Sequence, residues 1–253
     1  MILTCKTMGC GGRFGNQMFA LATGLGLARK LGVQLQIPAD WIGRKIFKIN
    51  LPGIEDKHAV QAPLDFLPTE KEFSSFDRID LYGYFQYQEA MNLYSRKDIL
   101  EWFPFQEWVL KKFPKSNKPI IEHIRRGDYV SQPMRYCSIS DESYSRLESS
   151  RGWNLDHIHK ITEENPTKDQ FCENISIGFL PDFMLMVNSN ILVRSNSTFS
   201  FWGGVFSKGE VWAPLVEDKI GWQTVEFTKG NWPRFADSKY HPVKLTDLHL
   251  REE

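Results

Sequence analysis

Pro119-Ile-Ile-Glu-His-Ile-Arg-Arg-Gly-Asp128 is an apolar run that ends in two adjacent arginines. The apolar residues predict a buried strand, and Gly127 can supply the sharp turn that ends it. Arg125 and Arg126 then lie at the carboxyl end of the strand, which is where open α/β sheets bind ligands. The planar fork of an arginine binds phosphate through two parallel hydrogen bonds. The alternative is a surface salt bridge between Arg126 and Asp128.

A second polar segment follows a second apolar strand. The strand is Asn190–Arg194, the segment is Ser195-Asn-Ser-Thr198, and a helix is predicted to begin near Phe199. Hydroxyl groups and the free N–H groups of a helix start can together surround a phosphate. An ordinary helix cap is the alternative for this segment. With the N-terminal glycine-rich segment described next, the chain has three such strand-end sites, which together favour an anionic ligand.

A glycine-rich segment, Gly9-Cys-Gly-Gly-Arg-Phe-Gly15, follows a predicted first strand at residues 1–7. We expect a helix to begin at Asn16 as its cap and to end before Gly32, with a second strand at residues 33–37. This is a β-α-β unit. The glycine spacing does not match a dinucleotide fingerprint or a Walker loop. A helix start of this kind suits an anion or a polar sugar.

The rest of the sequence predicts further helices and strands, although their patterns are less regular. The middle, residues 41–113, has no clean periodicity apart from a short strand within Leu81–Tyr87. Later elements are a capped helix at 140–147, a strand at 156–162 and a helix at 181–187 with Phe183, Met186 and Val187 facing inward. No element is predicted after residue 218. The polar, proline-terminated linker at 115–119 predicts two domains, 1–115 and 116–253.

The composition excludes several classes of protein. The chain of 253 residues has 42% hydrophobic and 25% charged residues, which is typical of globular domains. Its 31 basic and 31 acidic residues give no overall attraction to nucleic acid or to anionic lipid, so phosphate binding must be local. The four cysteines lack zinc spacing, and the sequence lacks a signal peptide and an apolar run of about 20 residues. We therefore expect a cytoplasmic protein with reduced thiols and no membrane span.

Three motifs resemble those of the GDP-fucose-dependent α-1,2-fucosyltransferases, in the same order along the chain. They are Gly11-Gly-Arg-Phe-Gly-Asn-Gln-Met-Phe19, His123-Ile-Arg-Arg-Gly-Asp-Tyr129 and Asn196-Ser-Thr-Phe-Ser-Phe-Trp-Gly203. Asp182-Phe-Met-Leu-Met also resembles the segment that this family places before its third motif. The first motif is similar to that of the protein O-fucosyltransferases in the wider fucosyltransferase superfamily.

The resemblance implies an α/β chain with a GT-B-like fold, in which two Rossmann-like domains face a cleft. The N-terminal domain would bind the acceptor and the C-terminal domain the GDP-sugar. The resemblance also implies an inverting transfer of fucose without a metal ion or other cofactor. The partners expected are thus a GDP-sugar donor and a glycan acceptor.

The resemblance further assigns roles to individual residues. Arg125 and Arg126 would hold the diphosphate, His123 would contact the nucleotide, and Asp128 would orient the arginine fork. Arg126 and Asp128 are thereby the catalytic candidates. The other donor-binding candidates are Gly12, Gly15 and Asn16 from the N-terminal half, Asp182 for the guanine edge, and Asn196, Ser197, Thr198 and Phe199.

Three hypotheses for the function stay open at this stage. The first is transfer of fucose to a glycan hydroxyl, O2 of a terminal galactose above all. The second is a protein O-fucosyltransferase or another nucleotide-sugar transferase, and the third is a glycosyltransferase fold that binds without catalysis. An inverting reaction needs a general base, for which Asp128, Glu122, Asp141 and Glu142 all remain open. The acceptor and the oligomeric state are not predicted.

Overall fold

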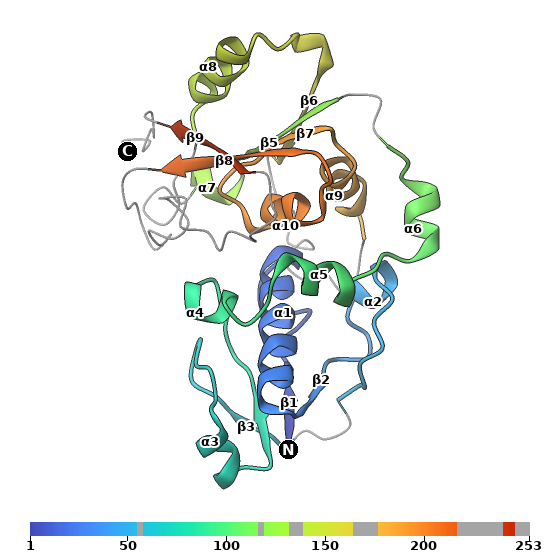
Figure 1. Ribbon diagram of the computed structural model, residues 1–253, viewed down its shortest axis with the longest axis vertical. Coiled ribbons are helices and arrows are strands. Elements are labelled where there is room, and N and C mark those ends of the chain that lie inside the picture. Colours follow the sequence, from blue (N-terminus) through green and yellow to red (C-terminus); the bar gives the residue numbers. More distant parts are fainter. Residues whose placement is uncertain (55–57, 116–118, 132–138, 164–176, 217–239, 246–253) are drawn as a thin grey trace. The chain divides into compact units, whose positions relative to one another are not determined.

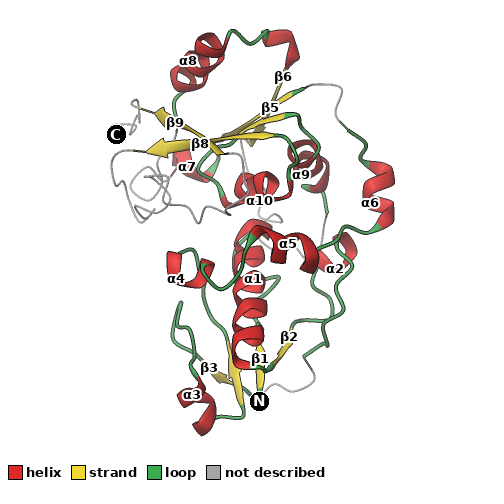
Figure 2. Cartoon of the chain, in the orientation of Figure 1, coloured by secondary structure: helices red, strands yellow, loops and turns green. Residues whose placement is uncertain are grey.

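The computed structural model describes residues 1–54, 58–115, 119–131, 139–163, 177–216 and 240–245. The chain forms two compact units, and each is described by itself (Figure 1). Unit 1 comprises Met1–Lys112 with residues 168–177, and unit 2 comprises Phe113–Thr167 with Gly178–Glu253. Both units alternate strands with helices, so the predicted α/β class is confirmed (Figure 2).

The sheet of unit 1 has four parallel strands in the order β2-β1-β4-β3. The strands are β1 (Ile2–Thr4), β2 (Gln34–Gln36), β3 (Val60–Gln61) and β4 (Arg78–Asp80). Buried Leu3 pairs in register with buried Leu35 and Ile79, which places the core beside the middle of the sheet. The predicted first two strands are confirmed, although β1 is shorter than residues 1–7.

Helix α1 (Phe14–Leu31) connects β1 to β2 and completes the predicted β-α-β unit. Its end is as predicted, because Gly32 adopts a left-handed φ of 63° after two basic residues. Its start differs from the prediction. The N-cap is Arg13 and not Asn16, which lies inside the first turn.

The middle of unit 1 contains five helices of four to seven residues each. They are α2 (Gly43–Ile46), α3 (Glu70–Ser75), α4 (Gln88–Met91), α5 (Arg96–Trp102) and α6 (Glu107–Lys112). Helices this short present only one to two turns of sequence, too little to establish a period of 3.6 residues. This explains why the sequence showed no clean pattern over this region.

The strand predicted within Leu81–Tyr87 is wrong, because β4 ends at Asp80 and the next residues form a loop. Phe85 has a φ of +53°, which a strand does not allow. The carboxylate of Asp65 accepts hydrogen bonds from the N–H groups of Tyr84 (2.6 Å) and Phe85 (2.7 Å). A side chain, not a neighbouring strand, therefore satisfies the backbone here.

An aromatic group packs beneath the glycine loop of unit 1. The ring of Phe14 stacks on Trp41 and on Phe47, with centroid distances of 6.3 and 6.2 Å. The indole N–H of Trp41 donates to Gln17 Oε1 (2.7 Å), and Gln17 Nε2 donates to the carbonyl of Gly12 (2.8 Å). Buried Gln17 thus connects the aromatic core to the loop that follows β1.

Two free cysteines lie on either side of the turn after β1. Cys5 is buried, and its N–H donates to the carbonyl of Gln36 (3.2 Å). Burial is the main cause that raises the pKa of the Cys5 thiol far above its ordinary value. Cys10, five residues later, is exposed. Cys137 and Cys172 lie outside the described residues.

The sheet of unit 2 has five parallel strands in the order β6-β5-β7-β8-β9. Their bounds are Ile120–Arg125 for β5, Ile158–Glu163 for β6, Ile191–Val193 for β7, Glu210–Val216 for β8 and Tyr240–Leu245 for β9. The predicted strands at β5, β6 and β7 are confirmed. In chain order this arrangement is 2-1-3-4-5, one of the two common orders of doubly wound sheets.

The helices of unit 2 are α7 (Asp128–Ser131), α8 (Asp141–Arg151), α9 (Leu180–Val187) and α10 (Thr198–Phe206), with a short 3₁₀ helix at Leu155–His157. The helices predicted at 140–147 and 181–187 are confirmed, with Phe183 and Met186 buried and Val187 half-buried. Neighbouring residues of β5 point to opposite faces of the sheet. Glu122 faces α8 and His123 faces α10, so these helices cover opposite faces (Figure 1).

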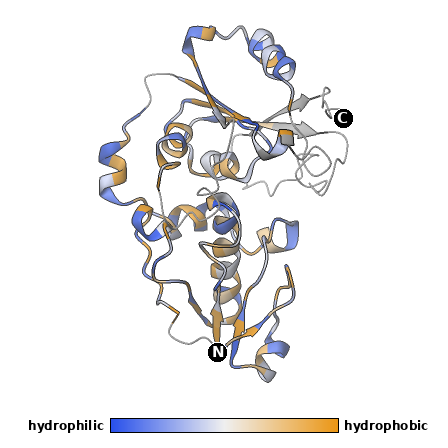
Figure 3. Cartoon of the chain, turned by 180° about the vertical axis from the view of Figure 1, so that it is seen from behind, coloured by the Kyte–Doolittle hydropathy of each residue, from blue (hydrophilic) through white to orange (hydrophobic). Residues whose placement is uncertain are grey.

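Helix α8 is largely hydrophilic (Figure 3), and a small group of buried residues holds it to the sheet. Tyr144 and Leu147 of α8 belong to a core cluster with Ile124, Ile139, Val193 and Trp212. The Tyr144 hydroxyl donates to the backbone carbonyl of His123 (3.2 Å). The helix is therefore fixed directly to β5. No helix among the described residues is long and apolar enough to span a bilayer.

Candidate functional site

Strand β5 carries the first predicted site segment. All six of its residues are buried, and it lies between β6 and β7 in the sheet. The strand ends at Arg125, and Gly127 makes the predicted turn with a φ of +52° before α7 begins. Strand order reverses between β5 and β7, so the carboxyl ends of these two strands flank the topological switch point, where doubly wound sheets bind ligands.

The side chain of His123, in β5, contacts the segment that follows β7. Its side chain is only 2% exposed, and Nδ1 lies 2.8 Å from the hydroxyl oxygen of Ser195. The imidazole also meets the ring of Phe199 edge-on, with centroids 5.8 Å apart. Ser195 Oγ lies 3.3 Å from Ser200 Oγ, which continues the polar contact into α10. The structure thus brings His123 and Phe199 together, and their contact with a nucleotide stays a prediction.

Arg125 lies buried beside an aromatic ring. Its guanidinium carbon is 5.3 Å from the ring centroid of Tyr129, which allows a cation–π interaction. The Tyr129 hydroxyl donates to the backbone carbonyl of Asn196 (3.3 Å). Arg125 and Asn196 are therefore neighbours through Tyr129, a residue that the sequence-based site did not include. The sequence did contain a signal for Tyr129, because this residue ends the second motif.

The segment after β7 forms the cap of α10. Ser197 is the N-cap, and its hydroxyl accepts a hydrogen bond from the N–H of Phe199 (3.2 Å). Thr198 is the first residue of the helix and is half-buried. Helix α10 therefore begins at the carboxyl end of β7, and its N-terminus favours an anion at the switch point.

Arg126 contacts the first residue of α8, and its contact with Asp128 stays a prediction. Its guanidinium donates to the backbone carbonyls of Ile139 (2.9 Å) and Arg125 (3.2 Å), and it forms an ion pair with Asp141. Asp141 thus has the role that was predicted for Asp128, whose side chain lies outside the described part of the structure. The sequence signal for Asp141 was its place in the acidic first turn of α8.

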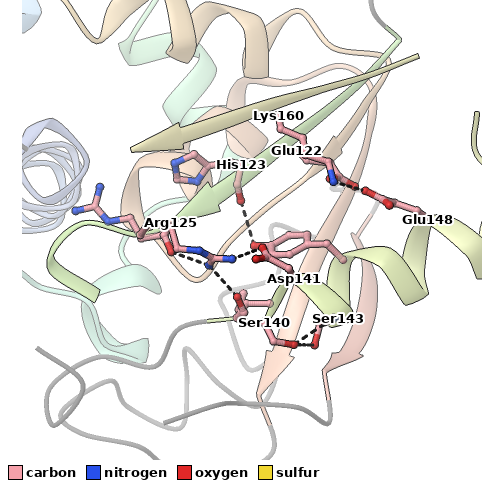
Figure 4. Close-up of polar contacts among 11 residues, drawn as sticks. Glu122, His123, Arg125, Ser140, Asp141, Ser143, Glu148 and Lys160 are labelled. Carbon is pink, nitrogen blue, oxygen red and sulfur yellow. Dashed lines mark hydrogen bonds and ion pairs between the residues drawn. The ribbon is translucent and has the colours of Figure 1, made fainter. Parts of the chain in front are cut away.

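A second polar cluster lies on the opposite face of β5 (Figure 4). Glu122 is fully buried and faces Glu148 of α8, and Lys160 of β6 lies 3.6 Å from Glu122 Oε2 and 2.8 Å from Glu148 Oε1. Burial is the main cause that raises the pKa of Glu122 to about 8, and the charge of Glu148 adds to it. The raised pKa favours the protonated form of the Glu122 carboxyl.

Asp182 lies in the first turn of α9 and is exposed. The next residue, Phe183, is fully buried, and its ring lies 5.5 Å from that of Phe199. Helix α9 therefore packs beside the start of α10 and carries Asp182 near this part of unit 2. Its assignment to the guanine edge stays a prediction.

The glycine loop of unit 1 carries the three remaining predicted residues. Gly12 has a φ of +88°, and a Cβ there would lie 2.6 Å from Asn16 Nδ2, so both conformation and space require glycine. Gly15 is buried in the first turn of α1. Asn16 Oδ1 accepts a hydrogen bond from Gln86 Nε2 (3.1 Å) in the loop after β4.

The structure thus places the predicted residues in two groups. Gly12, Gly15 and Asn16 lie in unit 1, at the carboxyl ends of the neighbouring strands β1 and β4. The other described candidates lie in unit 2 around β5, α9 and α10. The approach of Asn16 to a donor bound by unit 2 stays a prediction. No group of three or more His, Cys, Asp or Glu residues that could hold a metal occurs in the described ranges.

Comparisons with known proteins give similarities of structure alone. No family model and no curated protein sequence matches the chain. The crystal structure of NodZ α-1,6-fucosyltransferase soaked with GDP-fucose is 13% identical, with 81% of this chain and 92% of that chain covered and a TM-score of 0.47. POFUT1 in complex with GDP is 12% identical, with coverage of 82% and 95% and a TM-score of 0.49. Likenesses of this degree carry no weight in the argument for function.

Proposed function

We propose that this chain is a fucosyltransferase that moves fucose from GDP-fucose to a hydroxyl group. The observation that carries the proposal is the position of two predicted phosphate-binding segments at one switch point. Arg125 is the last residue of β5 and Arg126 follows it, and the α10 cap at Ser197 follows the adjacent β7. Guanidinium groups and a helix N-terminus at the same sheet edge suit a nucleoside diphosphate.

The choice of GDP-fucose as donor is supported by the sequence motifs. The segments around Asn16, Arg126 and Ser197 resemble those of GDP-fucose-dependent enzymes in type and in order. In this assignment Arg126 and Arg125 bind the diphosphate, His123 contacts the nucleotide, and Asp182 pairs with the guanine edge. The remaining proposed donor contacts come from the start of α10 and from Gly12, Gly15 and Asn16 of unit 1.

In the proposed reaction, the main task of the site is to stabilise the leaving group, GDP. The bond between fucose C1 and the β-phosphate oxygen breaks, and the acceptor oxygen bonds to C1 from the opposite face. Negative charge develops on the β-phosphate, and the N–H groups of Arg126 and of the α10 N-terminus stabilise it. The acceptor hydroxyl transfers its proton to a base. Glu122 does not fit that role, because it is fully buried against α8.

For the acceptor, we propose O2 of a terminal galactose, on the resemblance of the motifs to the α-1,2 enzymes. Transfer to a protein hydroxyl is the second candidate. It is favoured by Gly12-Arg-Phe-Gly-Asn-Gln17, which is similar to the first motif of the protein O-fucosyltransferases. Both acceptors use the same donor, so the donor can be tested first.

Calorimetry with GDP, GDP-fucose, UDP and UDP-glucose tests the donor. We expect GDP and GDP-fucose to bind with similar affinity and the uridine nucleotides to bind weakly. A preference for UDP would exclude fucose, and no binding of any nucleotide would exclude a transferase. A screen of galactose-terminated glycans and of folded protein acceptors with GDP-fucose then distinguishes the two acceptors. Binding without transfer to either would support a non-catalytic module.

A further inference from the structure

The guanidinium of Arg126 is held by three acceptors from unit 2. Nη1 donates to the carbonyls of Ile139 (2.9 Å) and Arg125 (3.2 Å), and Nη2 donates to Asp141 Oδ1. The Arg126 side chain is 21% exposed, whereas Asp141 is 78% exposed. The arginine is thus fixed from the protein side while its partner carboxylate faces solvent.

The three contacts leave N–H groups of the guanidinium for a ligand. An arginine has five N–H groups in one plane. Two of the contacts involve Nη1 and one involves Nη2. Among the described residues, no acceptor is found for the N–H of Nε, which lies on the same side of the guanidinium as Nη2. A pair of parallel N–H groups is what a bidentate contact with phosphate requires.

Asp141 is the charged acceptor among these three. Contacts of helix α8 hold its backbone in place. It is the first residue of α8, whose N-cap Ser140 accepts a hydrogen bond from the N–H of Ser143 (3.2 Å). A carboxylate in the first turn is favoured by the helix dipole. Tyr144 ties the same helix to the carbonyl of His123. The carboxylate is therefore fixed relative to the strand that carries Arg126.

We propose that Asp141 is a positioning residue that orients Arg126 for bidentate binding of the diphosphate. The proposal rests on the proposed function, in which Arg126 binds the β-phosphate of GDP. Asp141 acts through Arg126 and makes no contact with the ligand. Without its carboxylate, the guanidinium keeps only the two neutral acceptors and samples other orientations about its side-chain bonds.

The test compares Asp141→Asn with the wild-type chain by calorimetry, using GDP and GMP as ligands. GMP lacks the β-phosphate, so it reports binding that does not depend on Arg126. We expect the affinity for GDP to fall about tenfold, as for loss of one charge-assisted hydrogen bond, and the affinity for GMP to change little. Asp141→Glu keeps the carboxylate and should recover part of the loss.

Glu142→Gln is the matched control, because it removes an equal charge from the same turn of α8. Loss of a nearby negative charge by itself strengthens the binding of an anion, and this control measures that effect.

The melting temperature of each variant shows whether α8 stays folded. Wild-type affinity for GDP in Asp141→Asn, or an equal loss for GDP and GMP, would overturn the positioning role. Failure of the wild-type chain to bind GDP would instead overturn the proposed function.

Discussion

At the scale of single residues, Arg126 provides the sharpest test of the site. Its guanidinium bonds to two carbonyls and one carboxylate, and its remaining N–H groups are proposed to bind the diphosphate. We expect Arg126→Ala to weaken GDP binding about 100-fold, as for loss of a bidentate charged contact. Arg126→Lys should recover little, because an ammonium cannot satisfy these acceptors and a bidentate phosphate contact together. Calorimetry with GDP measures both effects.

The control for this prediction is Arg146→Ala. Arg146 is exposed on α8, so its removal changes the net charge equally without altering the switch point. Its affinity for GDP should stay near that of the wild-type chain. An Arg126→Lys variant that binds GDP normally would show that only the charge matters.

Gly43 in unit 1 tests the aromatic core below the glycine loop. A Cβ at this position would overlap the six-membered ring of Trp41. Trp41 is fixed by its hydrogen bond to Gln17, so the ring cannot move without breaking that bond. We expect Gly43→Ala to lower the free energy of unfolding by about 2 kcal/mol, as for overpacking of a core. Urea denaturation followed by tryptophan fluorescence measures this change.

Gly53→Ala is the comparison for Gly43. A Cβ at position 53 would meet its nearest atom, the Cβ of Ala39, at 3.4 Å, which is an ordinary van der Waals contact. This variant should keep the stability of the wild-type chain. Equal losses in both variants would mean that the close approach of Gly43 to Trp41 is not the cause.

At the scale of elements, the contact of α8 with β5 and β6 should depend on pH. Glu122 has a pKa of about 8 in the folded chain, against an ordinary value near 4.5. Between these values the folded chain binds a proton that the unfolded chain has released. The stability that this proton provides is complete below about pH 4.5 and is lost as the pH rises through about 8.

We therefore expect the free energy of unfolding of unit 2 to fall across this window, by up to about 1.4 kcal/mol per pH unit. Glu122→Gln has a neutral side chain of the same shape and should reduce this slope. The measurement is urea denaturation at pH 5, 6, 7 and 8. Glu142→Gln, on the exposed side of α8, should keep the wild-type slope. Equal slopes in the wild-type and Glu122→Gln chains would refute the assignment.

The elements that the sequence predicted well have local signals. Buried strand β5 carries three isoleucines and ends just before a glycine turn, and α8 has a serine cap followed by acidic residues. The end of α1 was similarly marked by Gly32. These signals involve residues close in sequence, so they need no knowledge of the rest of the chain.

The elements that the sequence missed depend on distant residues. The aromatic alternation at Leu81–Tyr87 resembles a strand, but Asp65, about 20 residues earlier in the chain, binds the N–H groups that a strand would need. Strand β9 (Tyr240–Leu245) contains a proline, which weakens a strand pattern. It is tolerated because β9 is at the edge of the sheet. Helix α1 begins after Arg13, and the Asn16 side chain, predicted to cap it, bonds instead to the distant Gln86.

At the scale of the whole molecule, each unit has a predicted site segment at the carboxyl ends of adjacent parallel strands. In unit 1, Asn16 after the glycine loop bonds to Gln86 in the loop after β4, and in unit 2, His123 of β5 contacts Ser195 in the segment before the α10 cap. The sequence predicted these segments because each follows an apolar strand. It did not predict Asp141 as the partner of Arg126, because that contact joins residues 15 positions apart.

The proposed reaction should not require a divalent metal ion. Arg126 and the N-terminus of α10 are proposed to supply the positive charge that stabilises departing GDP. We expect transfer from GDP-fucose to continue at an unchanged rate in the presence of EDTA. The measurement is GDP release with a glycan acceptor, before and after dialysis against the chelator. Loss of activity that manganese restores would contradict this prediction.

The reactivity of the two cysteines that follow β1 can report local unfolding of unit 1. Cys10 is exposed, so an alkylating reagent can reach it in the native chain. Cys5 is buried near Gly24 of α1 and has a raised thiol pKa, so it is expected to react when the packing around it opens. Mass spectrometry of the N-terminal peptide then counts one adduct for a closed unit and two for one that has opened. A single wild-type sample thereby yields the rate of local unfolding beneath the glycine loop, without an introduced label.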